Sequence, residues 1–287
     1  MSNKGDDLFS QAKSIYTSAV NEYKPRKTFC LFSGGHDSLS ITHWAMEEMG
    51  ADAVAHVNTG IGIEETRDFV RETCNKYGWP LHEYYAGKAY EDIIKEHGFP
   101  GPQSHRFMYI LLKERGVADL VRDHKEHRND NIMLVTGVRK QESNRRMGTI
   151  EPVYKQGARI WTAPFVDMSK IDVNRYLQSV GAPRNQVVDT LHMSGECLCG
   201  AFAHKGEFDE IKMWYPHVAA EIERLEKVAE EHGKPWRWEH PGPPDWYKQM
   251  QQGQQIFGFD NDPQMMCTSC NARNQLGESY EVDRRHE

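Results

Sequence analysis

Lys27-Thr-Phe-Cys-Leu-Phe-Ser-Gly-Gly-His-Asp-Ser-Leu-Ser40 is the most informative stretch of this 287-residue chain. It begins with a short apolar run, Phe29 to Phe32, which is typical of a buried strand and ends abruptly at two glycines. Apolar residues at helical spacing follow, from Leu39 to Met49. A strand that turns through glycines into a helix suits phosphate, because its backbone amides form a concave nest and the helix N-terminus adds positive potential. The stretch therefore predicts a phosphate-binding loop between the strand and the helix.

The candidate phosphate ligands are the six residues of this loop: Ser33, Gly34, Gly35, His36, Asp37 and Ser38. The serines add hydroxyl donors, and Asp37 suits either a helix N-cap or a ligand of phosphate-bound Mg²⁺. The loop is neither the Walker loop, which needs Gly-Lys-Ser/Thr, nor the GxGxxG turn of dinucleotide-binding folds. An ordinary glycine-rich turn capped by Asp37 is the alternative that the loop alone leaves open.

The composition is that of a soluble globular protein, with 38% hydrophobic and 27% charged residues. A net charge of -7 argues against a nonspecific nucleic-acid coat protein, but it leaves room for one basic pocket. The first residues lack the apolar core of a signal peptide, and no run of 18 apolar residues occurs. We therefore expect a cytoplasmic location and no membrane partner.

Strands and helices are expected to alternate along the chain. Strands are predicted at 52–58, 79–85 and 131–137, and helices at 7–22, from about 67 to 77, at 89–97, 104–115 and 119–130. An extended segment, 160–167, precedes a helix in which Ser169 and Asp172 approximate a capping box. Connections of this length imply βαβ units, so the expected fold class is α/β, a doubly wound and mostly parallel sheet. Ligands of such sheets bind beyond the carboxyl ends of the strands.

Two further strand ends carry candidate nucleotide ligands. The strand at 52–58 runs into Asn58, Thr59 and Gly60, and the strand at 131–137 ends at Gly137 before a basic run. In that run Arg139, Arg145 and Arg146 present planar forks that suit phosphate or sulfate oxygens. Arg106, on the helix at 104–115, is a further candidate. The alternatives are a bare turn at 58–60, a basic loop that neutralises acidic neighbours, and a solvated charge at Arg106.

Two close pairs of cysteines predict a metal site: Cys197 with Cys199, and Cys267 with Cys270. Two pairs separated by a long insert suit a tetrahedral four-sulfur site, which holds either structural Zn²⁺ or a [4Fe-4S] cluster. Spacing alone does not separate these two. We expect a nucleotide-binding domain over 1–190 and a mostly helical, metal-binding appendage over 191–287, with an amphipathic helix at 205–232. Cys30 and Cys74 are expected to be buried thiols.

The motif SGGxDS after a strand resembles the PP-loop of the ATP pyrophosphatase (adenine nucleotide alpha-hydrolase) superfamily. Several later segments resemble the 3'-phosphoadenylylsulfate (PAPS) reductase-like family within it, in the right order. They are Thr59-Gly60 followed by Glu65-Thr66, then Gly137, Arg139, Glu142, Ser143 and Arg146, and then Pro164, Asp172 and Tyr176. The resemblance covers roughly residues 27 to 200. The chain departs from the family at Asn58 and Glu64, and it has His36 where many ATP users have lysine.

The resemblance implies an adenine-nucleotide-binding enzyme in which Thr59 and Gly60 contact the nucleoside. It places a [4Fe-4S] cluster ahead of zinc at the four cysteines, as in assimilatory adenylylsulfate reductases. The reductases use a mobile C-terminal cysteine, and this chain has none after Cys270. The leading hypothesis is therefore an ATP-dependent adenylating or sulfur-transfer enzyme that uses ATP with Mg²⁺ and releases pyrophosphate. Asp37, Arg139, Arg145 and Arg146 would be its catalytic residues.

Two alternatives stay open at this stage. One is a PAPS or adenylylsulfate reductase whose thiol comes from elsewhere, and the other is a non-catalytic nucleotide-binding subunit. The expected partners are the adenine nucleotide and either a sulfur donor or a thioredoxin-like reductant. A nucleic-acid acceptor and a homo-oligomer are left open.

Overall fold

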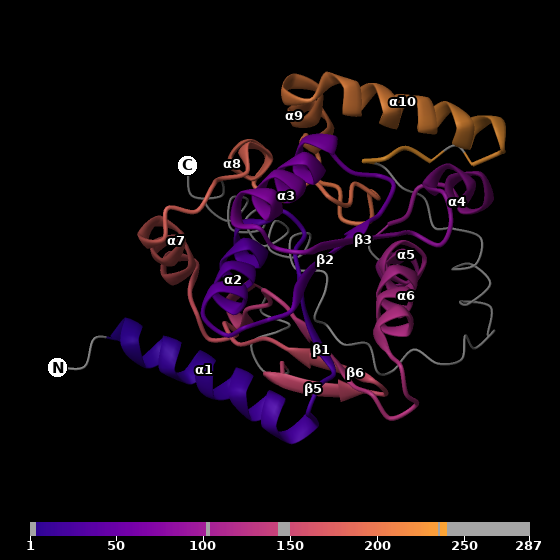
Figure 1. The fold of residues 1–287 in the computed structure, drawn as a ribbon. Coiled ribbons are helices and arrows are strands. Elements are labelled where there is room, and N and C mark those ends of the chain that lie inside the picture. Colours follow the sequence, from indigo (N-terminus) through magenta and orange to yellow (C-terminus); the bar gives the residue numbers. More distant parts are fainter. Residues whose placement is uncertain (1–3, 102–103, 143–149, 235, 240–287) are drawn as a thin grey trace.

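The computed structural model describes residues 4–101, 104–142, 150–234 and 236–239. Within these ranges the chain alternates between strands and helices, as predicted (Figure 1). The strands are β1 (Lys27–Leu31), β2 (Ala53–Asn58), β3 (Leu81–Tyr85), β4 (Ile132–Val135), β5 (Val153–Gln156) and β6 (Arg159–Thr162). The first helices are α1 (Lys4–Tyr23), α2 (His36–Glu47), α3 (Glu64–Tyr77), α4 (Tyr90–His97), α5 (His105–Tyr109) and α6 (Arg115–His124). The later helices are α7 (Lys170–Ser179), α8 (Gln186–Leu191), α9 (Glu207–Trp214) and α10 (Pro216–Glu231).

The six strands form one sheet in the order β3-β2-β1-β4-β6-β5. All neighbouring pairs are parallel except β5 with β6, which is antiparallel. The predicted α/β class with a mostly parallel sheet is therefore confirmed. β2 and β3 lie on one side of β1, and β4 lies on its other side. The carboxyl ends of β1 and β4 thus face a point where the direction of winding reverses, and parallel sheets bind ligands at such points.

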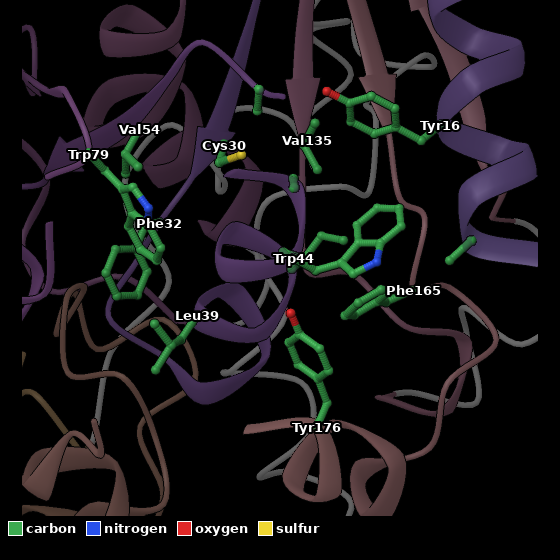
Figure 2. Packing of buried hydrophobic residues seen from close by; sticks show 14 of the residues in the cluster. Tyr16, Cys30, Phe32, Leu39, Trp44, Val54, Trp79, Val135, Phe165 and Tyr176 are labelled. Atoms are coloured by element: carbon green, nitrogen blue, oxygen red, sulfur yellow. The ribbon is translucent and has the colours of Figure 1, made fainter. Parts of the chain in front are cut away.

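Alternate side chains of each strand enter two separate apolar clusters, as the two-residue period of a strand requires. Cys30 of β1 and Met133 of β4 pack on one face with α1, α2, α3 and α7. Phe29 of β1 and Leu134 of β4 pack on the other face, with α6. Figure 2 shows the first cluster, in which Trp44 of α2 lies among Tyr16, Phe165 and Tyr176. The central strands β1, β2 and β4 are therefore buried on both faces, which is usual for parallel sheets.

A third cluster lies beyond the sheet and joins the C-terminal helices to the segment that follows β2. It contains Ile61 and Ile63, which follow β2, together with Leu198 and Cys199 and the apolar faces of α4, α9 and α10. Figure 1 shows α9 and α10 packed beyond α3 and α4. The division of the chain at residue 190 stays a prediction, and so does the metal-binding character of the appendage.

Local predictions differ from the structure at several places, and α8 was not predicted. The helix expected at 205–232 is two helices, because Pro216 lacks an amide hydrogen and begins α10 at its first position. The helices expected at 104–115 and 119–130 are instead α5 and α6, joined by a π-helical turn at Ile110–Glu114 and ending at His124. The hairpin partner β5 was not predicted. The capping box of Ser169 and Asp172 is confirmed at the start of α7.

Candidate functional site

The predicted phosphate loop leaves β1 and enters α2 without a side-chain cap. Gly35 is the N-cap residue of α2, and no described side chain accepts a hydrogen bond from the first turn of that helix. The first amides of a helix have no partner within it, so they are available to an anion. Asp37 lies in this first turn, but it does not cap the helix. The alternative of a turn capped by Asp37 is therefore wrong.

Gly34 takes a conformation and a position that only glycine fits. Its φ is +79°, and a Cβ there would lie 2.5 Å from Cγ2 of Thr66 in α3. The buried Asn185 connects the loop to α3. Its Nδ2 donates to the Gly34 carbonyl at 2.9 Å and to Thr66 Oγ1 at 3.2 Å. Asn185 is also the N-cap of α8. Its sequence context allows a helix start, but it carries no sign of this contact with the loop.

The two serines of the loop brace each other. Ser38 Oγ lies 3.1 Å from Ser33 Oγ and donates to the Gly35 carbonyl at 2.9 Å. The Ser33 amide donates to Ser38 Oγ at 3.3 Å. Both hydroxyls therefore hold the shape of the loop, and the donors it can offer to a ligand are mainly its backbone amides.

Gly137, at the end of β4, lies directly against the first turn of α2. A Cβ on Gly137 would come within 2.7 Å of the carbonyl carbon and oxygen of Asp37 and within 2.8 Å of the Ser38 amide nitrogen. All three are backbone atoms, so a side chain cannot be accommodated there by a rotamer change. The two strand ends that were predicted to share a site therefore touch.

Asp37 joins three segments of the site through its carboxylate. Arg139 Nη2 donates to Oδ2 at 3.0 Å, and Lys170 Nζ, from the start of α7, donates to Oδ1 at 3.1 Å. Burial alone would raise the pKa of Asp37, but the charges of Arg139 and Lys170 hold that pKa below its ordinary value. Arg139 is buried, and its Nη1 also lies 3.5 Å from the Met168 carbonyl oxygen. Asp37 and Arg139, which were predicted separately, thus form an ion pair.

His36 approaches a different carboxylate, that of Asp189. Its side chain is buried, and Nε2 lies 3.9 Å from a carboxylate oxygen of Asp189 in α8. Burial, helped by the nearby charge of Arg184, lowers the pKa of His36 to about 4. The imidazole is therefore neutral at neutral pH, so His36 brings no positive charge to the phosphate loop.

The segment after β2 is tied to the residues just before the cysteine pair. The Thr59 amide donates to Glu196 Oε1 at 3.0 Å, and Thr59 Oγ1 donates to the Glu196 carbonyl at 2.6 Å. Two backbone bonds continue the contact, from the Leu198 amide to the Ile61 carbonyl and from the Ile63 amide to the Gly195 carbonyl. The Gly60 amide donates to Asn58 Oδ1 at 2.9 Å, which forms a tight turn. The polar groups of Thr59 are thus engaged within the protein.

Glu196 is a buried acid that the sequence reasoning missed. Its carboxylate lies 3.2 Å from His56 Nε2 and 3.6 Å from Arg67 Nε, and all three side chains are almost fully buried. Burial alone would lower the pKa of His56, but the neighbouring Glu196 carboxylate raises it above its ordinary value. A Glu beside cysteines gives no sequence signal for this role, since its partners lie about 130 residues away along the chain.

Cys197 and Cys199 lie at one pocket, and Leu198 between them is hydrogen-bonded to Ile61, three residues after β2 ends. They line it together with Met193, His204, Glu207 and Trp238. Cys199 is buried and Cys197 is partly exposed. Within the described ranges no group of three or more metal-binding side chains occurs. Cys267 and Cys270 lie outside those ranges, and so do Arg145 and Arg146.

Arg106 lies on α5 and is partly buried. The neighbouring His105 ring packs on Phe202, which also lines the cysteine pocket. This part of α5 is therefore adjacent to the cysteine pocket. No membrane-crossing helix is present in the described ranges, where every helix is too short or too polar for that purpose.

The chain is similar to a known protein family and to several known proteins. Residues 27–195 match the family model of the phosphoadenosine phosphosulfate reductase domain. A curated relative, an uncharacterized protein of Methanocaldococcus jannaschii, is 24% identical over 195 residues, which is 65% of this chain and 44% of the relative. The chain thus spans less than half the length of that relative.

Solved structures with a similar fold include two enzymes. One is phosphoadenylyl-sulfate (PAPS) reductase from Candida auris in a phosphate complex, with a TM-score of 0.48 and 19% identity over 64% of this chain and 85% of that chain. The other is Candida glabrata FMN adenylyltransferase with FMN and the ATP analog AMPCPP, with a TM-score of 0.47 and 12% identity over 65% of this chain and 61% of that chain.

Proposed function

The chain belongs to the phosphoadenosine phosphosulfate reductase domain family, and on that premise we propose that it is an enzyme that cleaves ATP between the α- and β-phosphates. One observation carries this proposal. The uncapped first turn of α2, reached through Gly34, lies against Gly137 at the point where the winding of the sheet reverses. This arrangement offers a row of backbone amides at the place where a doubly wound sheet binds nucleotides.

In the proposed reaction, a nucleophilic atom of an acceptor attacks the α-phosphorus of ATP. The bond between that phosphorus and the bridging oxygen breaks, and its electron pair leaves on pyrophosphate. The loop at 33–38 holds the departing pyrophosphate through its amides. Arg139, which is fixed beside Asp37, supplies positive charge near the reacting phosphorus, and we assign the same role to Arg145 and Arg146.

Asp37 could bind the Mg²⁺ that accompanies ATP only after one of its hydrogen bonds to a cationic side chain had broken. Both carboxylate oxygens of Asp37 accept hydrogen bonds from cations, one from Arg139 and one from Lys170. An oxygen becomes available to a metal once Lys170 leaves it.

Cys197 and Cys199 suit one edge of a four-sulfur site, because both line the same pocket. We propose that Cys267 and Cys270 complete it, and that the site holds a [4Fe-4S] cluster or, alternatively, structural Zn²⁺. A cluster would supply or activate sulfur for an acceptor. The contact between Glu196 and Thr59 places this pocket next to the proposed nucleoside contacts. A sulfur donor is then the expected protein partner.

The name of the family favours a second candidate, the reduction of PAPS or adenylylsulfate to sulfite. That reaction needs an accessible thiolate. Burial raises the pKa of Cys74 to about 12, and burial raises the pKa of Cys30 further still. Neither thiol is suited to the task, so a reductase would need one of the four paired cysteines or a thiol from a thioredoxin-like partner.

Product analysis separates these functions. The protein is incubated with MgCl₂ and α-labelled ATP, and AMP or adenylated products and pyrophosphate are measured against ADP and phosphate. Adenylate-level products with pyrophosphate support the proposal, and ADP contradicts it. Sulfite released from PAPS with thioredoxin would support the reductase instead. Tight ATP binding without any turnover would indicate a non-catalytic nucleotide-binding subunit.

A further inference from the structure

The phosphate loop itself carries no positively charged side chain that can reach a ligand. Its donors are backbone amides, and its one titratable base, His36, is buried beside Asp189 and neutral. The triphosphate of ATP carries several negative charges. A cation from outside the loop must therefore meet the two terminal phosphates if the loop is to hold them.

Arg139 is poorly placed for that role because it is locked in position. Its side chain is buried, it pairs with Asp37 at 3.0 Å, and it lies 3.5 Å from the Met168 carbonyl oxygen. A buried guanidinium that left this carboxylate would lose its counter-charge, which is costly in the protein interior. Arg139 therefore keeps Asp37 as its partner.

Lys170 has the opposite properties at the same carboxylate. Its side chain is 49% exposed, and its ammonium group lies 3.1 Å from Asp37 Oδ1. An ion pair of this exposure is worth about 1 kcal/mol or less, so it breaks easily when a stronger anion arrives. Asp37 would keep Arg139 as its counter-charge after Lys170 had left. One carboxylate with two cations leaves one net positive charge at the uncapped end of α2.

The backbone beside Lys170 is held rigidly. Ser169 caps α7, with its amide donating to Asp172 Oδ2 at 2.9 Å and its hydroxyl accepting from the Asp172 amide at 3.2 Å. This capping box fixes the backbone from which the Lys170 side chain extends, and the side chain itself is half exposed. The backbone of Lys170 is therefore fixed, whereas its ammonium group is held only by an exposed ion pair.

We propose that Lys170 is the phosphate-binding lysine of this site, which exchanges Asp37 for the β- and γ-phosphates when ATP binds. The inference rests on the proposed function for the identity of the ligand. It assigns Lys170 to recognition of the pyrophosphate part of ATP, which separates ATP from AMP. It also gives Asp37 a free oxygen in the ATP complex, at the position where a phosphate-bound cation would sit.

Calorimetric titration with inorganic pyrophosphate, ATP and AMP tests this role. Lys170→Met should weaken the binding of pyrophosphate and ATP by about tenfold to a hundredfold, as expected for one lost hydrogen bond between charged groups, and should change AMP binding little. Lys170→Arg should retain part of the affinity. Lys212→Met is the matched control, because Lys212 is also exposed and pairs with Glu223 between α9 and α10. This control should bind all three ligands as the wild type does.

The double variant Asp37→Asn with Lys170→Met distinguishes phosphate binding from simple neutralisation. The double variant is compared with Asp37→Asn alone. If Lys170 only balances Asp37, Lys170→Met costs no pyrophosphate affinity in the Asp37→Asn background, and that result overturns the proposal. Equal pyrophosphate affinity in wild type and Lys170→Met also overturns it, as does a wild type that binds no pyrophosphate. Pyrophosphate binding that depends on Lys170, in a protein that releases none from ATP, supports this inference and refutes the proposed function alone. Circular dichroism melting curves confirm that each variant is folded.

Discussion

Replacement of Gly137 by alanine is the sharpest perturbation of the site, because the contact it creates is with backbone. The new methyl group would lie 2.7 Å from the Asp37 carbonyl carbon and oxygen and 2.8 Å from the Ser38 nitrogen, far inside van der Waals contact. No side chain can rotate to relieve this overlap, so β4 and the first turn of α2 must move apart. Overpacking of this kind costs about 1–3 kcal/mol of stability.

The structural consequence of Gly137→Ala is a displaced phosphate loop. An amide nest binds phosphate only while its N–H groups converge, and hydrogen bonds weaken steeply with poor geometry. We therefore expect the affinity for ATP to fall by about tenfold or more, which corresponds to a loss of about 1.4 kcal/mol. Calorimetric titration with ATP measures the affinity, and urea unfolding measures the stability.

Gly116→Ala provides a matched control for this experiment. A methyl group there would meet Val57 Cγ1 at 2.9 Å and Tyr84 Cβ at 3.3 Å, on the other face of the sheet from α2. It should destabilise the protein to a similar extent but leave ATP affinity unchanged. The reasoning is refuted if Gly137→Ala loses stability while it keeps wild-type affinity. It is refuted equally if the two variants lose ATP affinity together.

Three further predictions concern the buried charges and the cysteines. Glu196→Gln leaves His56 and Arg67 without their shared carboxylate and should cost about 3–5 kcal/mol in urea unfolding. Because Glu196 raises the pKa of His56, wild type should lose stability relative to this variant as the pH rises through that pKa, and a difference that does not depend on pH would contradict the pairing. The pKa of His36 is instead lowered from 6.5 to about 4, so the folded state resists protonation of the ring. As the pH falls from 6.5 to about 4, wild type should therefore lose stability relative to His36→Gln. Parallel pH profiles for wild type and His36→Gln would show that His36 is not buried as a neutral base. Cys197→Ser should lose the bound iron or zinc, as measured by elemental analysis after anaerobic purification. Cys30→Ser, which changes a buried thiol in β1, should retain the metal. Equal metal content in the two variants would contradict the proposed cysteine site.

Much of the fold could be predicted because each strand and helix signals itself locally. The apolar run of β1, its two glycines and the helical spacing after them indicated a strand, a turn and α2 from sequence alone, and the alternation of elements implied a parallel sheet. Pro216 shows the limit of periodicity. The helical spacing of apolar residues continues from α9 into α10, but the helix itself is interrupted at Pro216. The π-helical turn between α5 and α6 likewise leaves no mark in the apolar pattern.

The candidate site was predictable only where its residues lie in the loops at strand ends. Asn185, Glu196 and Lys170 were missed because their roles depend on contacts with distant segments: Asn185 with Gly34, Glu196 with Thr59 and Lys170 with Asp37. A polar residue between helices gives no local sign of such a contact. His36 was predicted as a phosphate ligand from its position in the loop, and that prediction stays untested. Its burial, which makes the imidazole neutral, could not be read from the sequence.

The central claim is that the ends of β1, β2 and β4 hold one ATP molecule, with its pyrophosphate part on the loop at 33–38. A crystal structure of the protein with α,β-methylene ATP tests it most directly. The β- and γ-phosphates should lie against the amides of Gly34 to Ser38, beside Gly137, with the adenosine toward Gly60. A nucleotide bound in another cavity, or with its phosphates directed away from this loop, would contradict the claim.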